Sequence, residues 1–252
     1  MMSNENNSIR TVYTLIAIQA RSTSSRLPGK ILEMIGSKPI LSMIQQACDS
    51  SKRHVERQKP DKTRIKHMVD IAILHPYHDE LLMKSFKTLG CQLVAGPEDD
   101  VLQRYLNAVE KFNPDYIVRI TADCPLILPF MISKHINTAV YNSLDYVSNV
   151  HESCRTVADG LDVEIMSRKA IAWLRENATT AQEKEHVTLA IRQKMPKELT
   201  MGFVFSNLDT SSMKFSVDTV EDLQNVRNMF HERERKMAEA VKIFGYKGIY
   251  EC

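Results

Sequence analysis

The chain has 252 residues, of which 43% are hydrophobic, and this length suits one large α/β domain or two small ones. Its 33 Lys and Arg residues nearly balance its 31 Asp and Glu residues. The resulting net charge of +2 does not indicate a basic surface for binding nucleic acid or a membrane. No apolar run approaches the roughly 20 residues of a membrane span, and five cysteines without a CxxC pair argue against a zinc knuckle and favour a reducing compartment. The polar start lacks a signal-peptide core, so we expect a cytoplasmic protein with a flexible arm at 1–10 and a single domain at 11–252.

Strand and helix patterns alternate through the first 142 residues. Apolar runs predict strands at 15–20, 69–74, 91–95 and 116–121. Amphipathic spacing predicts helices at 39–48, 79–89, 101–112 and 130–142, with Gly90 ending the second. Residues 50–67 are polar, rich in cations and contain Pro60, which predicts a solvated connection or an insertion.

The alternation loosens in the second half of the chain. The predicted strands there are 161–165, 203–205 and 214–217, and the predicted helices are 168–177, 182–194 and 221–242. Repeated strand–helix units imply a mostly parallel sheet that helices cover on both faces. The long, charged last helix is a candidate interaction element.

The loop after the first strand is the most informative segment. The sequence TLIAIQARSTSSRLPGK at 14–30 carries an apolar run into small polar residues, with Arg21, Arg26 and Lys30 around them. Small side chains let backbone N–H groups approach an anion, and the cations neutralise it. On spacing alone, this is either a phosphate-binding loop or an ordinary strand-to-helix connection with solvated charges.

Two aspartates follow predicted strands. Asp123 lies in YIVRITADCPLILP and Asp218 in KFSVDTVEDLQNVR. Carboxyl ends of parallel strands are where α/β sheets bind ligands, and carboxylates suit Mg²⁺. The alternatives are structural: Asp123 could cap a turn, and Asp218 could begin a helix with Thr219 and Asp222. Together with the cationic loop, the two aspartates form a consistent set for nucleotide phosphates and a metal.

Three further segments carry weaker signals. Asp162 and Glu164 alternate with apolar residues, which places both carboxylates on one strand face, either for a ligand or as the wet side of an edge strand. Glu185 and His186 lie near a predicted helix start, where such a pair is more often surface than catalytic. The turn GPEDDVLQR at 96–104 is either a base-binding turn or a helix start that the dipole favours.

Six segments spread over most of the chain resemble segments of one known family, and they occur in the same order as in that family. They are IAIQARSTSSRLPGKIL (16–32), GPEDDVLQRY (96–105), VRITADCPLI (118–127), GLDVEI (160–165), EKEHVT (183–188) and FSVDTVEDLQNVR (215–227). Together they resemble the sugar-acid cytidylyltransferases of the CMP-Kdo and acylneuraminate synthetase type, and above all the spore-coat polysaccharide biosynthesis protein F branch. The resemblance implies a GT-A-like, Rossmann-like three-layer α/β sandwich with a mostly parallel mixed sheet. It also implies Mg²⁺-dependent transfer from CTP to a sugar acid, giving CMP-sugar and pyrophosphate for cell-surface polysaccharide or lipopolysaccharide synthesis.

The resemblance also implies roles for individual residues. The catalytic residues would be Arg21, Lys30 and Asp123. The nucleotide-binding residues would be Ala20, Arg21, Ser22, Lys30, Gly96 and Arg104. The metal ligands would be Asp123 and Asp218, and the sugar-binding residues would be Glu164, Glu185 and His186. A homodimer is expected on family grounds, with no nucleic-acid or membrane partner.

The sequence departs from the family at three places and leaves two rival functions open. Ser22-Thr23-Ser24-Ser25-Arg26 stands where that branch usually has a Met-Gly-Ser-Thr-Arg run, His75-Pro76 stands where relatives tend to have small hydroxyl residues, and the segment at 50–67 is longer and more basic than expected. One rival is a GT-A-like glycosyltransferase using a nucleotide sugar, but Asp123 stands without the second acid of the usual Asp-x-Asp pair. The other is a non-catalytic nucleotide-binding homologue, which the retained charged residues disfavour.

Overall fold

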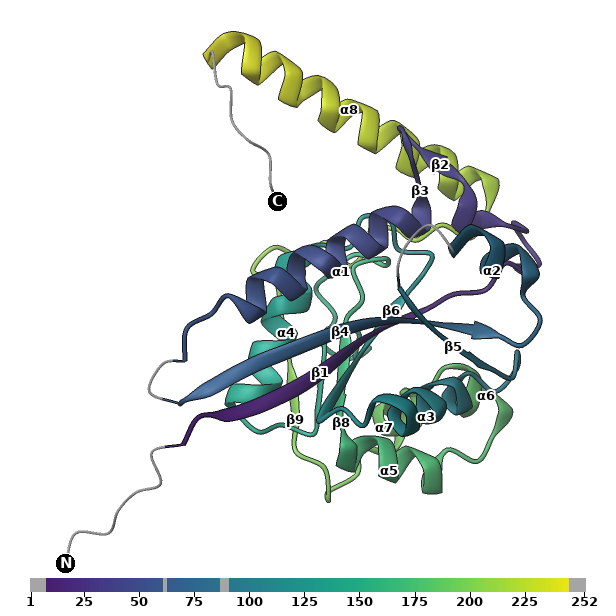
Figure 1. The fold of residues 1–252 in the computed structure, drawn as a ribbon. Coiled ribbons are helices and arrows are strands. Elements are labelled where there is room, and N and C mark those ends of the chain that lie inside the picture. The colour runs from purple at the N-terminus through teal and green to yellow at the C-terminus, as the bar shows by residue number, and fades with distance from the viewer. Residues whose placement is uncertain (1–7, 61–62, 87–90, 245–252) are drawn as a thin grey trace, which may run out of the picture.

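The computed structural model describes residues 8–60, 63–86 and 91–244, and its centre is a twisted seven-stranded sheet (Figure 1). In spatial order, the strands are β5 (Gln92–Gly96), β4 (Ile65–Pro76), β1 (Arg10–Gln19), β6 (Tyr116–Thr121), β8 (Glu164–Ser167), β7 (Tyr146–Ser148) and β9 (Met201–Phe203). β8 alone runs antiparallel to its neighbours, and the other pairs are parallel. The predicted mostly parallel mixed sheet is therefore confirmed.

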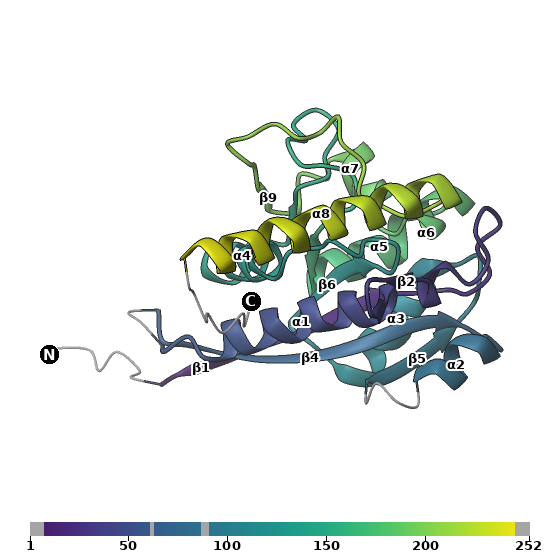
Figure 2. The same cartoon turned by 90° about the horizontal axis from the view of Figure 1, so that it is seen from above.

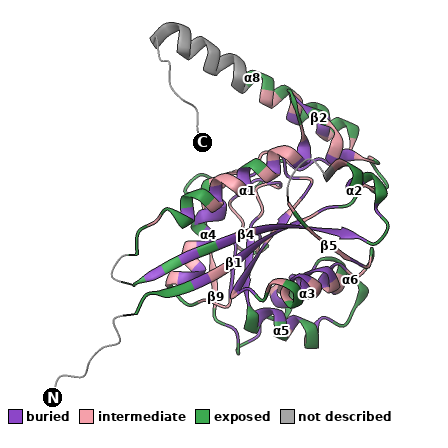
Figure 3. Cartoon of the chain, in the orientation of Figure 1, coloured by how far each residue is buried: buried purple, intermediate pink, exposed green. Residues whose placement is uncertain are grey.

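Helices cover both faces of this sheet, which gives the three layers that the sequence predicted (Figures 1 and 2). On one face lie α1 (Ile40–Glu56) and α4 (Pro129–Tyr141), and on the other α3 (Val101–Phe112), α5 (Arg168–Asn177), α6 (Ala181–Glu185) and α7 (Leu189–Lys194). Alternate residues of β1 feed the two cores: Ile16 and Ile18 pack on the first face, Leu15 and Ala17 on the second. The central strands are accordingly the most buried part of the molecule (Figure 3).

The smaller elements lie around the end of the sheet where β1 finishes. A short 3₁₀ turn (Lys30–Leu32) leads into a hairpin of β2 (Met34–Ile35) and β3 (Lys38–Pro39), and α2 (Glu80–Phe86) follows β4. The last helix, α8 (Val220–Phe244), begins beside β2 and extends away from the body (Figures 1 and 2). The homodimer stays a prediction, with α8 as its candidate element. None of the helices in the described ranges is long and apolar enough to cross a membrane.

The prediction of a solvated connection over 50–67 was wrong at both ends. Helix α1 continues to Glu56, with Ser51 and Val55 buried, and β4 begins at Ile65. Within the helix, Arg53 and His54 are exposed, while Ser51 and Val55, four residues apart, are buried, with Ser51 Oγ 3.0 Å from Ser133 Oγ of α4. A high density of charge therefore concealed an amphipathic helical turn.

Three predictions in the second half also need correction. The single helix over 182–194 is two helices, α6 and α7, separated at Val187, which has a φ of 52°. The strand predicted over 161–165 begins only at Glu164, so Asp162 precedes it. Residues 214–217 form no strand and make one isolated bridge, from Asp159 to Lys214.

Some of the remaining bounds agree with prediction and others do not: β1 spans Arg10–Gln19 rather than 15–20, β4 Ile65–Pro76 rather than 69–74, and β9 Met201–Phe203 rather than 203–205. The helices at 101–112 and 168–177 and the strand at 116–121 have the predicted bounds. The short β7 and the β2–β3 hairpin were not predicted, because two- and three-residue strands leave no periodicity to read. The helix end predicted at Gly90 and the first seven residues of the predicted arm lie outside the described residues, and Arg10 already belongs to β1.

Candidate active site

A cavity opens at the carboxyl ends of β1 and β6, between the loop after β1 and the start of α8. This is the edge of a parallel sheet at which α/β proteins place their ligands. The residues that the sequence predicted and that line this cavity are Ala20, Arg21, Lys30, Arg104, Asp123, Glu185, His186 and Asp218. Gly96, Ser22 and Glu164 do not line it, and Arg119 lines it without having been predicted.

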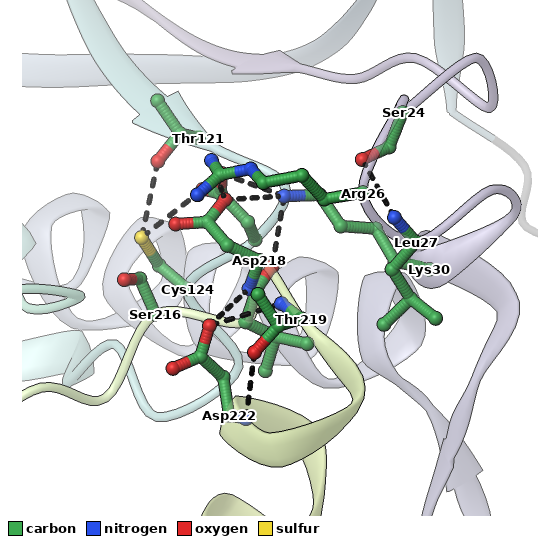
Figure 4. A network of polar contacts seen from close by, with 12 residues as sticks. Ser24, Arg26, Leu27, Lys30, Thr121, Cys124, Ser216, Asp218, Thr219 and Asp222 are labelled. Atoms are coloured by element: carbon green, nitrogen blue, oxygen red, sulfur yellow. Dashed lines mark hydrogen bonds and ion pairs between the residues drawn. The ribbon is translucent and has the colours of Figure 1, made fainter.

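Lys30 bridges Asp123 and Asp218, and Figure 4 shows Lys30 beside Asp218. Its Nζ atom lies 3.1 Å from Asp123 Oδ2 and 3.1 Å from Asp218 Oδ1, and it donates a 2.8 Å hydrogen bond to the Val217 carbonyl. Only 8% of Lys30 is exposed, so this ammonium is fully used within the protein. Two carboxylates that lie 95 residues apart in sequence thus face the same point of the cavity.

The start of α8 presents Asp218 to the cavity and leaves helix capping to its neighbours. Asp222 accepts hydrogen bonds from the amides of Asp218 (3.0 Å) and Thr219 (2.9 Å), and Thr219 Oγ1 accepts one from the Asp222 amide. Burial raises the pKa of Asp222, but Lys214 and these amides outweigh it and lower the value to about 2. Since Thr219 and Asp222 cap the helix, the Asp218 carboxylate is left to pair with cations, which include Arg26 at 3.0 Å.

Backbone contacts fix the separation of the two aspartates. The Val217 amide donates a 2.8 Å hydrogen bond to the Asp123 carbonyl. This bond joins the loop after β6 to the segment that leads into α8. Gly160 packs closely against the same segment, because a Cβ there would lie 2.4 Å from the Ser216 nitrogen. Its φ of 97° also favours glycine. Burial raises the pKa of Asp123, yet Lys30 and hydrogen bonds outweigh it and hold that pKa below its ordinary value.

This donor set fits a divalent cation such as Mg²⁺. Asp123 and Asp218 offer hard carboxylate oxygens, and Mg²⁺ is commonly bound by one or two carboxylates together with substrate phosphates. Within the described ranges, no group of three or more His, Cys, Asp or Glu side chains could hold a metal ion by itself. Two carboxylates therefore suit a metal that also takes oxygens from substrate phosphates.

The serines of the loop after β1 have two different environments: one bonds within the protein and two line the cavity. Ser22 donates from its amide and its hydroxyl to the buried Asp79 carboxylate, at 2.8 and 2.6 Å. Gly29, with a φ of 72°, closes the loop by donating from its amide to the Ser22 carbonyl at 2.8 Å. Ser24 and Ser25, by contrast, line the cavity beside Arg21. Asp79, which also caps α2, was not singled out in the sequence because a lone acid before a helix is usually only a cap.

Arg104 connects the 96–100 turn to the cavity. It is 1% exposed, and its Nε and Nη2 donate to the carbonyls of Pro97 and Glu98, the first at 2.7 Å. Burial lowers the pKa of Arg104 below its ordinary value. Gly96 permits this packing, because a Cβ there would lie 2.7 Å from Arg104 Cγ. The guanidinium thus shapes the turn while part of the side chain faces the cavity.

Glu164 lies beneath the cavity and holds Arg119. The Arg119 Nη1 atom lies 2.8 Å from Glu164 Oε2, while the other carboxylate oxygen accepts from Tyr146 Oη and, at 2.7 Å, from Thr188 Oγ1. Burial raises the pKa of Glu164, but Arg119 and these donors outweigh it and lower that pKa. A lone arginine within the apolar run YIVRIT was the sequence signal for this pair. The predicted strand face shared by Asp162 and Glu164 is not formed, because β8 begins at Glu164, and Asp162, which precedes it, pairs with Arg155.

Glu185 and His186 form the opposite wall at the end of α6. Both are exposed and line the cavity, so the predicted segment reaches the site. The turn that presents them is fixed by a capping box between Thr180 and Glu183 and by the positive φ of buried Val187. A β-branched residue in that conformation is a genuine outlier, and such strain is often found beside functional sites.

Comparison with known proteins agrees with this geometry. The family model described as "Cytidylyltransferase" matches residues 15–244. The chain is 26% identical to the spore coat polysaccharide biosynthesis protein SpsF of Bacillus subtilis, over 86% of each chain. It is 29% identical to a 3-deoxy-manno-octulosonate cytidylyltransferase of Thermodesulfovibrio yellowstonii, over 61% of this chain and 54% of that one. A solved cytidylyltransferase of Leptospira borgpetersenii superposes with a TM-score of 0.76 at 24% identity, covering 95% of this chain and 100% of that one, and shows the same fold.

Proposed function

The chain belongs to the cytidylyltransferase family, and from this we propose that it activates a sugar acid with CTP, releasing pyrophosphate and giving a CMP-sugar for cell-surface polysaccharide synthesis. The observation that carries the proposal is the contact of Lys30 with both Asp123 and Asp218 at the mouth of a cavity lined by further cations. That arrangement combines groups that bind phosphates with groups that bind a divalent metal.

The loop after β1 would hold the triphosphate. Arg21 and Arg26 line the cavity, and Lys30 reaches it from the loop's end, so positive charge surrounds the small residues Ser24 and Ser25. The acceptor hydroxyl would attack the α-phosphorus, the bond to the β-phosphate oxygen would break, and pyrophosphate would leave. Negative charge grows on the phosphoryl and leaving-group oxygens in such a step, and fixed cations stabilise it.

Asp123 and Asp218 would hold the Mg²⁺ that the family resemblance implies. When bound, that ion would supply charge neutralisation on the phosphate oxygens. The protein's own contribution is placement: Lys30 and the bond from Val217 to Asp123 keep the two carboxylates at one point of the cavity. The depressed pKa of Asp123 keeps this carboxylate ionised and ready to coordinate a cation at neutral pH.

The two remaining walls would select the substrates. The 96–100 turn, shaped by Arg104, would lie beside the base, and Glu185 with His186 would lie beside the sugar. Both assignments follow from the family resemblance and from the position of these residues on the cavity. Ser22 would act by shaping the loop through Asp79, rather than by direct contact with the nucleotide.

A pyrophosphate-release assay tests the proposal. Four nucleoside triphosphates would be combined with a panel of sugar acids, with and without Mg²⁺, for the wild type and the Asp123→Asn variant. The Asp209→Asn variant is the matched control, since Asp209 is an exposed acid bonded only to Ser211 among the described residues. We expect release only with CTP, an acid and Mg²⁺, and loss of release in Asp123→Asn alone.

Two outcomes would favour the rival functions. Consumption of a UDP-sugar without pyrophosphate release would indicate a glycosyltransferase on the same fold. CTP binding without turnover of any acid would indicate a non-catalytic nucleotide-binding homologue.

A further inference from the structure

Arg119 is a buried cation on the floor of the cavity whose hydrogen-bonding capacity is only partly used. It lies on β6, directly between Ala17 of β1 and Glu164 of β8 in the sheet register. Its Nη1 donates to Glu164 Oε2 at 2.8 Å, while its buried Nε has no hydrogen-bond partner among the described residues. Because the side chain also lines the cavity, an acceptor group of a ligand there can form a charge-assisted hydrogen bond with the rest of the guanidinium.

Arg119 shares its main counter-ion with a second arginine. Glu164 also faces Arg192, whose Nε lies 3.8 Å from its Oε1 atom. The other partner on that side, Tyr146, stays neutral, since burial and Glu164 raise the pKa of its hydroxyl. Asp162, a further acid that acts on Arg119, is itself paired with Arg155 at 2.5 Å. One carboxylate therefore serves two partly buried arginines, which leaves Arg119 able to pair with a further anion.

The position of Arg119 separates it from the cations of the phosphate loop. Arg26 and Lys30 pair with the aspartates beside α8, whereas Arg119 is anchored below the sheet edge to Glu164. Burial disfavours the charged form of Arg119, yet Glu164 outweighs it and holds the pKa above its ordinary value, so the side chain remains a cation. A planar guanidinium with a free edge matches a carboxylate in geometry as well as charge.

We infer that Arg119 binds the carboxylate of the acceptor sugar acid, with Glu164 as the residue that positions it. This inference rests on the proposed function, because it assumes that the acceptor is an acid. It assigns Glu164 an indirect role, in place of the direct sugar contact that the sequence suggested. The acid would be selected over a neutral sugar at this point of the cavity, independently of how the nucleotide is held.

The test pairs a protein change with a substrate change. Pyrophosphate release would be measured for 3-deoxy-manno-octulosonate and its primary amide, or for the same pair made from whichever panel acid is turned over. The variants are Arg119→Met and, in case this fails to fold, Arg119→Gln, which can still hydrogen-bond Glu164. Arg192→Met is the matched control, since Arg192 contacts the same carboxylate but does not line the cavity.

We expect the amide to raise KM at least about tenfold in the wild type and in Arg192→Met, the loss of one charge-assisted contact. In the Arg119 variants, KM for the acid should rise by a similar factor. In those variants, KM for the amide should then exceed KM for the acid by less than about threefold. CTP affinity and kcat should change little, which a general loss of structure would not produce. Unchanged discrimination between acid and amide in a folded Arg119 variant would overturn the inference alone, whereas absence of turnover for every acid in the wild type would overturn the proposed function.

Discussion

Glu164→Gln tests whether the buried charge cluster holds the sheet together under the active site. Glu164 is 1% exposed and receives hydrogen bonds or ion pairs from Arg119, Tyr146, Thr188 and Arg192. Glutamine keeps the shape but replaces one acceptor oxygen with an NH₂ group. With the NH₂ toward Arg119, a donor faces a donor; with it toward Tyr146 and Thr188, their hydroxyls must reverse to accept from it. In either case Arg119 and Arg192 lose their counter-charge.

Removing one partner of a buried ion pair costs about 3–5 kcal/mol. For a chain of this size, about 2–4 °C of Tm is lost per kcal/mol, so thermal unfolding should shift down by roughly 6–20 °C. The control is Glu80→Gln, whose partner Lys84 lies 3.8 Å away with both side chains 80% exposed. Such a surface pair contributes at most about 1 kcal/mol, so its Tm should hardly move.

The pH dependence separates charge from shape. Burial raises the pKa of Glu164, but Arg119 and Arg192 outweigh it, so the folded-state pKa is lower than in the unfolded chain. A depressed carboxylate pKa stabilises the folded state above the unfolded value and loses that contribution as pH falls. The gap between wild type and Glu164→Gln should therefore be full at pH 7 and shrink below about pH 4. A Tm within 1–2 °C of wild type at pH 7, or a gap that stays constant down to acid pH, would refute this reasoning about the pair.

Three further changes probe the site and its support. Asp218→Asn should leave the fold intact and lower kcat/KM for pyrophosphate release at least about 100-fold, since a lost metal ligand costs several kcal/mol of transition-state stabilisation; near-normal Mg²⁺-dependent turnover would contradict its assignment. Lys30→Ala should weaken CTP binding about tenfold or more by calorimetry, because it removes the cation that neutralises Asp123 and Asp218 beside the triphosphate; unchanged affinity would remove Lys30 from the phosphate site. Gly160→Ala should destabilise the fold in denaturant titrations by at least about 1–3 kcal/mol, because φ is 97° and the new Cβ would meet the Ser216 nitrogen; an unchanged midpoint would show that this backbone can move apart.

The sequence predicted those parts of the fold in which periodicity and packing agree. The strand at 116–121 and the helix at 101–112 have the predicted bounds because each presents a clean apolar pattern to one or both cores. The segment at 214–217 failed for a local reason: its backbone bonds go to Asp159 and Asp123 rather than to a neighbouring strand. An alternating pattern shows that one face is buried, but not whether a strand partner exists.

The cavity wall formed by the loop after β1 could be predicted because its residues are close together in sequence; phosphate binding by this loop stays a prediction. Arg21, Ser24, Ser25, Arg26 and Lys30 lie within ten residues, and all of them line the cavity. Local spacing did not show that Ser22 turns to Asp79, because that contact spans 57 residues. What a loop residue faces depends on the element packed behind it, and only the assembled fold supplies that element.

For Arg119, the sequence indicates that a partner is needed but does not identify it. A charged residue in the middle of a buried strand is costly unless it is paired, so the run YIVRIT already implied a buried acid somewhere in the fold. Which acid depends on strand order, and β8 pairs with β6 although 45 residues separate Arg119 from Glu164 and β7 intervenes in the chain. The antiparallel register then places the two side chains directly opposite, one on the cavity and one beneath it. The sequence therefore determined that this cation needs a partner, while the topology determined that the partner leaves part of the guanidinium open to a ligand.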